Sequence, residues 1–513
     1  MKMKFFNYEI AAWPRQTIGQ LRIPSGLTGR GLRLGLFVLS SLGVGLAVII
    51  STYYVNNVKL LIGLVGGLAF VLLTMRWPEF GILCLVALLS GLIPMGSLPA
   101  LHLGPISIQI PDVMLLVILG LVFLRATTQR GFVLFGSPLM LPLLLFIGAF
   151  LLSAVNAVLI YGVSPNLALR TVRVLSLWTV FIATLQLVRD KQALRRLLFG
   201  LLILTGILLA GVFLQNRLSP LLYIEMVATG TGAQASSGFT RFYYDGDMVL
   251  YAMIPVTVAS LATIKKGNQL WRIGLLGFLL YWVLMTYFRE YWLTLLTICI
   301  LLLGFLSSRE RMRLLKRMAP VAIAGVLIVV VLLVVVLVAG QATQVERIVQ
   351  PLAARWASLG QNVFDETSLQ WRALENRYAL QQISLHPVLG IGLGNAYRPP
   401  LELEAGGTSY EWTFDYMENG YLYIATYMGL IGLLPFLWLC AAYLLRVFRH
   451  QHEIRDEGLR AVYLGFGAAF LGMMACNFVS PTFVFGTRLI FFPLSMAISE
   501  VILRVAREQE ARQ

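Results

Sequence analysis

The chain has 513 residues, of which 58% are hydrophobic and 12% are charged, and its mean hydropathy is +0.80. This composition excludes a soluble globular enzyme, in which about 25% of residues are charged. It also excludes an intrinsically disordered chain, which requires low hydrophobicity. The net charge is +16. The four cysteines lie far apart in apolar runs and indicate neither a zinc site nor a disulfide framework.

Apolar runs of about 18–25 residues, the length that crosses a bilayer as a helix, recur along the whole chain. They predict an all-α fold: a polytopic membrane helical bundle of about 14 transmembrane helices with a large, partly helical extracytoplasmic loop. The predicted spans are 34–52, 58–75, 79–97, 109–126, 137–161, 166–187, 193–215, 246–264, 271–288, 290–307, 319–340, 419–445, 459–480 and 485–503. Because about thirty mixed residues precede the first run, no cleavable signal peptide is expected.

The distribution of Lys and Arg predicts the orientation of these helices. With both termini in the cytoplasm, the inner segments contain 28 of the 40 basic residues but 10 of the 24 acidic ones. Topology therefore explains the basic excess, and nucleic acid is not needed as a partner. The predicted organisation is a cytoplasmic tail (1–33), eleven helices (34–340), the large extracytoplasmic loop (341–418), three helices (419–503) and a second cytoplasmic tail (504–513).

The loop 341–418 is too long for a bare connection, which indicates a functional or partly folded segment. Within it, Ser368–Ser384 has Leu369, Ala373, Leu380 and Ile383 at helical spacing on one side. This pattern predicts an amphipathic helix on the membrane surface.

Span interiors are almost free of charge, which argues against an ion-coupled transporter. Charges gather instead at the predicted extracytoplasmic ends of the spans. Arginine there opposes the positive-inside tendency, which indicates a specific role for each one. Arg289 lies in a very short turn between two apolar spans. Its guanidinium can bind phosphate oxygens at membrane depth, or it can pair with Glu290 or extend to the interface.

Three further arginines occupy predicted outer ends. Arg241 precedes the span 246–264, whereas Arg170 and Arg173 stand three residues apart on one helical face. The sequence Asp245-Gly246-Asp247 follows Arg241, and its carboxylates can bind a metal ion or pair with that arginine. We favour pairing and predict no metal site.

Two motifs flank the end of the large loop. One is His386-Pro387-Val388-Leu389-Gly390-Ile391-Gly392-Leu393-Gly394, and the other begins at Glu418-Asn419 and continues, after nine residues, with Gly429-Leu430-Ile431-Gly432. Together with Arg241 and Arg289, they resemble the O-antigen ligase/polymerase superfamily over roughly residues 140–450. That family shows His-Pro-x-x-Gly-x-Gly, followed by His-Asn, nine residues and Gly-x-x-Gly.

The resemblance implies a glycosyltransferase in the bacterial inner (plasma) membrane that acts on its outer face. The donor is a glycan on undecaprenyl pyrophosphate, the acceptor is another glycan or a lipid-linked core, and no cofactor or metal is required. Glu418 stands where the family has the histidine expected to act as general base, and a carboxylate can do the same work. The alternative for Glu418 is an acid that stabilises a helix N-terminus.

The remaining roles combine this resemblance with the positions of the residues. Arg241 and Arg289 are expected to neutralise charge on the departing pyrophosphate. Arg372 and Arg377 either contact that pyrophosphate or form a solvated face. Arg170 and Arg173 either bind substrate or have a structural role, and Asn419 and His386 are further candidates for substrate binding. His386 is expected to anchor the loop, because Pro and Gly around it indicate a turn.

Two other classes of function stay open. Fourteen spans would also suit a flippase or transporter of lipid-linked glycans. The absence of the family's histidine would suit a non-catalytic partner in polysaccharide assembly. The choice between ligation and polymerisation is open as well.

Overall fold

The computed structural model describes residues 58–93, 101–103, 106–128, 136–218, 246–286, 289–338, 367–399, 416–484 and 486–511. Arg241 and the first predicted span, 34–52, lie outside the described residues. The chain divides into two units, Met1–Phe70 and Val71–Gln513. Of the first unit, only the part of α2 (Val58–Arg76) up to Phe70 is described. The packing below concerns the second unit.

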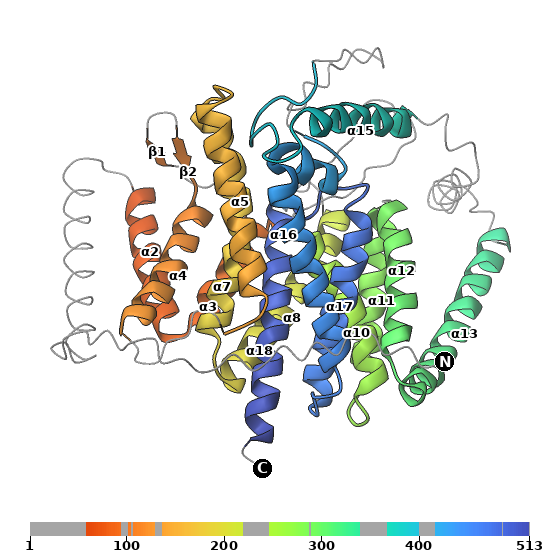
Figure 1. The fold of residues 1–513 in the computed structure, drawn as a ribbon. Coiled ribbons are helices and arrows are strands. Elements are labelled where there is room, and N and C mark those ends of the chain that lie inside the picture. The colour runs from red at the N-terminus through yellow and green to blue at the C-terminus, as the bar shows by residue number, and fades with distance from the viewer. Residues whose placement is uncertain are drawn as a thin grey trace, which may run out of the picture. The chain divides into compact units, whose positions relative to one another are not determined.

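The described residues are almost entirely helical, which confirms the all-α polytopic fold (Figure 1). A short antiparallel hairpin of β1 (Leu101–Leu103) and β2 (Ile106–Ile108) is an addition to it. After α2 the helices are α3 (Pro78–Leu89), α4 (Ile110–Thr128), α5 (Met140–Leu159), α6 (Pro165–Ser176), η2 (Leu177–Thr179), α7 (Val180–Leu187), α8 (Lys191–Leu218), α10 (Asp247–Thr263), α11 (Leu270–Thr286), α12 (Arg289–Phe305), α13 (Ser308–Val338), α15 (Thr367–Leu385), α16 (Gly420–His450), α17 (Glu457–Cys476), η4 (Thr487–Ile490) and α18 (Phe491–Glu510).

Within the described ranges, seven helices are long and apolar enough to cross a membrane, and five apolar helices of 10–17 residues accompany them. Every predicted span that falls on described residues coincides with a helix. This agreement is expected, because a helix satisfies its own backbone hydrogen bonds and is therefore stable in hydrocarbon.

Two predicted spans differ from the structure in their detail. The helix expected over 79–97 ends at Leu89, where Gly91 adopts a positive φ of 73° that favours glycine. The helix expected over 166–187 is interrupted by the 3₁₀ turn η2 between α6 and α7. At about 1.5 Å per residue, neither α3 nor α6 alone crosses about 30 Å of hydrocarbon.

The helix ends predicted to face the outside meet at one end of the unit. Asp247, at the start of α10, pairs with Arg488 of η4 (3.0 Å) and accepts a hydrogen bond from Tyr291 at the start of α12. The backbone N–H of Gly420, at the start of α16, donates to the carbonyl of Asn477 at the end of α17 (2.8 Å). We refer to this as the α16 N-terminal end.

The opposite end carries the ends predicted to face the cytoplasm, and its basic side chains are bound to carbonyls and carboxylates. Arg317 donates to the carbonyls of Leu261 and Ile264 at the end of α10 (2.6 and 2.8 Å), where helix dipoles favour a cation. Arg446 of α16 binds Glu500 of α18 through two hydrogen bonds (2.6 and 3.0 Å). The assignment of the two ends to the two sides of a membrane stays a prediction from the charge distribution.

Candidate active site at the α16 N-terminal end

The two sequence motifs contact each other through the backbone. Helix α16 breaks at Gly429, and the loop 386–394 binds the backbone groups that the break leaves without helical partners. Ile391 N–H donates to the carbonyl of Thr426 (2.9 Å), and Leu430 N–H donates to the carbonyl of Pro387 (2.9 Å). A broken helix is compatible with a membrane only when its backbone groups are satisfied in this way.

Glycine is required at this contact by both conformation and space. Gly429 has φ 62° and ψ −160°, a region that is essentially restricted to glycine. A Cβ there would lie 2.2 Å from the carbonyl oxygen of Val388. Gly392 has φ +84°, and its Cβ would lie 2.6 Å from the Cα of Ala157 in α5. The glycines therefore hold the loop against α5 and α16.

Glu418 and Asn419 precede the first residue of α16. The Asn419 side chain caps the helix, because its oxygen accepts from the N–H groups of Tyr421 (3.0 Å) and Leu422 (3.1 Å). Glu418 is half-buried, and α15 lies crosswise over this end of α16 (Figure 1). Asn419, which the sequence assigned to substrate binding, thus caps α16 with its side-chain oxygen in this structure.

One turn of α15 holds Glu418 by both its side chain and its backbone. The Nε of Arg372 donates to the Glu418 carboxylate, and the carboxylate of Glu375 accepts from the Glu418 backbone N–H (3.2 Å). The guanidinium of Arg398 lies 4.8 Å from the ring centroid of Trp371. Two arginines and two glutamates thus gather where α15 meets α16.

Glu375 is the most buried acid of this cluster, with 2% of its surface exposed. Burial and the nearby charge of Glu418 raise the pKa of Glu375 to about 7, although the hydrogen bond from the Glu418 backbone and the charge of Arg398 oppose the shift. A carboxylate that titrates near neutral pH in a cluster of charges is typical of a functional site.

The helix predicted over 368–384 is confirmed as α15, but the face that packs on the protein is not the apolar one. Its buried residues are Glu375 and Ala379, whereas Ala373 and Leu380 are exposed. Arg377 is exposed as well, so the structure brings only Arg372 of the predicted arginine pair to Glu418. Contact of the exposed face with a membrane surface stays a prediction.

His386 is the first residue of the loop 386–394, which we call the glycine loop, and Arg170 of α6 lies one turn after a residue that this loop contacts. The Nδ1 of His386 is 3.1 Å from the hydroxyl of Tyr161, just beyond α5, and their rings meet edge to face, a geometry that suits loop anchoring. A Cβ at Gly394 would lie 2.8 Å from the backbone of Leu167, one turn before the exposed Arg170. Arg173 instead pairs with Asp112 of α4 (3.2 Å).

A second charged cluster surrounds the start of α12. The Arg488 side chain is 8% exposed and the Asp247 side chain 3% exposed, and Arg488 also donates to the hydroxyl of Tyr291 (3.3 Å). Arg289 is the first residue of α12, two positions before Tyr291, and its side chain lies outside the described residues. Asp247 therefore pairs with Arg488, a partner that the sequence did not indicate.

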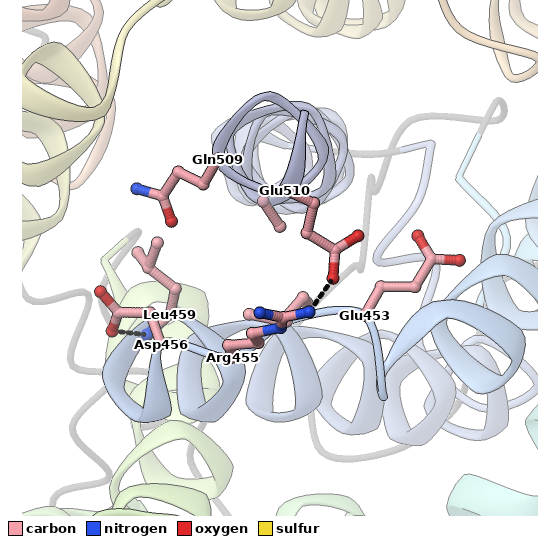
Figure 2. A pocket seen from close by; sticks show the side chains of 8 residues that line it. Glu453, Arg455, Asp456, Leu459, Gln509 and Glu510 are labelled. Atoms are coloured by element: carbon pink, nitrogen blue, oxygen red, sulfur yellow. Dashed lines mark hydrogen bonds and ion pairs between the residues drawn. The ribbon is translucent and has the colours of Figure 1, made fainter. Parts of the chain in front are cut away.

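The pocket in Figure 2 lies at the opposite end, between the α16–α17 connection and the end of α18. Its charged side chains are paired: Arg455 binds Glu510 at 3.2 Å, and Glu453 and Asp456 bind basic residues outside the lining. Its volume of about 60 Å³ admits a few water molecules but no sugar. We therefore do not place the active site there.

Within the described ranges, no group of three or more His, Cys, Asp or Glu side chains could hold a metal ion. Sequence reasoning missed Glu375 and Arg398. The spacing of Glu375, three residues after Arg372, was an available signal that the two share a helical face. No pattern in the sequence connects Arg398 to either.

Residues 274–437 match the model of the O-antigen ligase family. The match runs from α11 into α16 and includes α15, the glycine loop, Glu418 and the break at Gly429. The match supports membership of the O-antigen ligase/polymerase superfamily. A comparison with curated proteins finds no match. Membership of this superfamily associates this multi-pass membrane protein with glycan transfer in general.

Proposed function

We propose that the protein transfers a glycan from undecaprenyl pyrophosphate to a sugar hydroxyl at the outer face of the bacterial inner membrane. The observation that carries this proposal is the placement of Glu418 within the O-antigen ligase domain. Glu418 lies just before the N-terminus of α16, beside Arg372 and Glu375. The first residue of α12, Arg289, is at the same end of the unit.

The reaction is an inverting displacement. Glu418 takes the proton of the acceptor hydroxyl, the hydroxyl oxygen bonds to the anomeric carbon, and the bond from that carbon to the pyrophosphate oxygen breaks. Arg289 and Arg241 neutralise the charge that grows on the pyrophosphate, which stays on its lipid. Because a guanidinium has five N–H donors, Arg372 can hold a carboxylate and a phosphate together.

The remaining predicted binding residues surround this centre. Arg170 and Arg377 are exposed, so each can reach a substrate phosphate or sugar from its own helix. Arg173 and Asn419 act through their partners, Asp112 and the N-terminus of α16. His386 anchors the glycine loop, which packs against α5.

The test is transfer by purified protein in nanodiscs, without an ion gradient, using the lipid-linked glycan pool extracted from the source strain. Product mass is read by mass spectrometry with either that pool or the lipid-core fraction as acceptor. Longer chains on the carrier indicate polymerisation, and glycan on the core indicates ligation. A flippase or a non-catalytic assembly partner would yield neither product, and that result would refute the proposal.

Arg289→Ala is expected to lower transfer about 100-fold, the typical cost of removing one donor that stabilises a developing negative charge. Initial rates at saturating donor measure the effect. Arg309→Ala is the matched control, because Arg309 is an exposed arginine at the start of α13, at the opposite end of the unit. Full activity of the Arg289 variant would remove this residue from the site.

A further inference from the structure

We propose that Glu375 is a positioning residue of this site: it holds the Glu418 backbone and places a negative charge beside the Glu418 carboxylate. This inference rests on the proposed function, in which Glu418 accepts the acceptor's proton. Glu375 is 2% exposed, so it does not touch the substrate itself and acts through Glu418.

The geometry gives α15 two contacts with one residue. Arg372 binds the Glu418 side chain, and Glu375, one turn later, accepts from the Glu418 backbone N–H at 3.2 Å. Together they fix the position of Glu418 immediately before the cap of α16. Loss of both contacts would leave Glu418 attached to α16 alone.

The charges of the cluster explain why a second carboxylate is needed. The guanidinium of Arg372 places a positive charge against the Glu418 carboxylate and holds this proton-accepting group in an ion pair. A negative charge on Glu375 acts in the opposite direction, because two nearby carboxylates resist simultaneous ionisation. The other groups that face Glu375 are Trp371, one turn earlier on α15, whose side chain hydrogen-bonds to it, and Arg398 and the Tyr397 hydroxyl in the segment that follows α15.

The sign of the pH dependence follows. The pKa of Glu375 is raised to about 7 by burial and by the charge of Glu418. Above this pH Glu375 is ionised and its negative charge offsets that of Arg372 at Glu418, so transfer is fast. As the pH falls through about 7, Glu375 takes up a proton, its effect on Glu418 is lost and transfer slows. The acidic limb of the rate profile therefore reports Glu375.

The experiment compares pH–rate profiles from pH 5 to 9 for the wild-type protein, Glu375→Gln, Glu375→Asp and Glu508→Gln, each in nanodiscs with the extracted lipid-linked glycan pool. Glutamine keeps an oxygen that accepts from the Glu418 N–H but carries no charge. We expect this variant to lose the limb near pH 7 and to be about 10-fold slower at pH 8. Glu375→Asp should retain an acidic limb. Glu508, exposed near the end of α18, is the control and should leave the profile unchanged.

A limb near pH 7 that persists in Glu375→Gln would overturn the inference, as would equal rates for this variant and the wild type at pH 8. A uniform loss of rate with an unshifted limb would indicate a purely structural contact, which also contradicts it. If Glu375→Gln does not fold, loss of the limb in Glu375→Asp decides against the proposal and its retention supports it. Absence of transfer by the wild type would instead refute the proposed function.

Discussion

Glu418→Gln is expected to lower the rate of glycan transfer about 10³-fold, within the range typical for loss of a general base. Glutamine has the size of glutamate, and its amide oxygen can still accept from Arg372. It cannot take a proton from the acceptor, however. Initial rates of product formation by the purified variant, with far-UV circular dichroism to verify the fold, measure this effect.

Glu418→His is the informative companion variant. Histidine is the residue that the family carries at this position and it can act as a base, so this variant should retain far more activity than Glu418→Gln. Wild-type rates in both variants would exclude Glu418 as the base. An absence of transfer in all three proteins would favour the non-catalytic assembly role instead.

Gly429→Ala is expected to destabilise the protein by about 3 kcal/mol or more, the sum of a strained backbone and a steric clash. The backbone at Gly429 has φ 62° and ψ −160°, and an alanine Cβ would lie 2.2 Å from the Val388 carbonyl oxygen. The glycine loop would have to leave the break in α16, exposing backbone groups that it now satisfies. Thermal unfolding in detergent and the yield of monodisperse protein measure this loss.

Gly148→Ala is the matched control for this variant. Gly148 lies within α5, and nothing lies within 4 Å of the position its Cβ would take. Alanine there should leave the unfolding temperature unchanged or raise it slightly, because alanine favours a helix over glycine. Equal unfolding temperatures for the Gly429 and Gly148 variants would show that the break does not depend on glycine.

Part of the candidate site could be predicted from the sequence. The spacing from Asn419 to Gly429 and Gly432, with the His386 motif, indicates the family, and the match over 274–437 confirms it. Those motifs are local, so a single sequence reveals them. That they bind each other, with the loop filling the break in α16, depends on backbone contacts between segments some forty residues apart.

The environment of Glu418 was beyond prediction for the same reason. Arg372 was a candidate for contact with pyrophosphate and not for binding Glu418, and Glu375 and Arg398 were not singled out. The contacts of Arg372 and Glu375 with Glu418 depend on how α15 lies across α16, which no periodicity in α15 specifies. The apolar residues Ala373 and Leu380, predicted to face the membrane surface, do not indicate which face packs on the protein, and that face contains Glu375 and Ala379.

The sequence alone determined that the chain is a helical membrane protein and which segments form its helices. Hydrocarbon requires long apolar helices, and about twenty consecutive residues encode each one. It also determined the excess of basic residues in alternate connections. Only the tertiary structure decided what those charges bind: Arg317 meets the carbonyls at the end of α10, and Arg446 meets Glu500. Partners of charged groups lie far apart in the chain, and only packing brings them within reach.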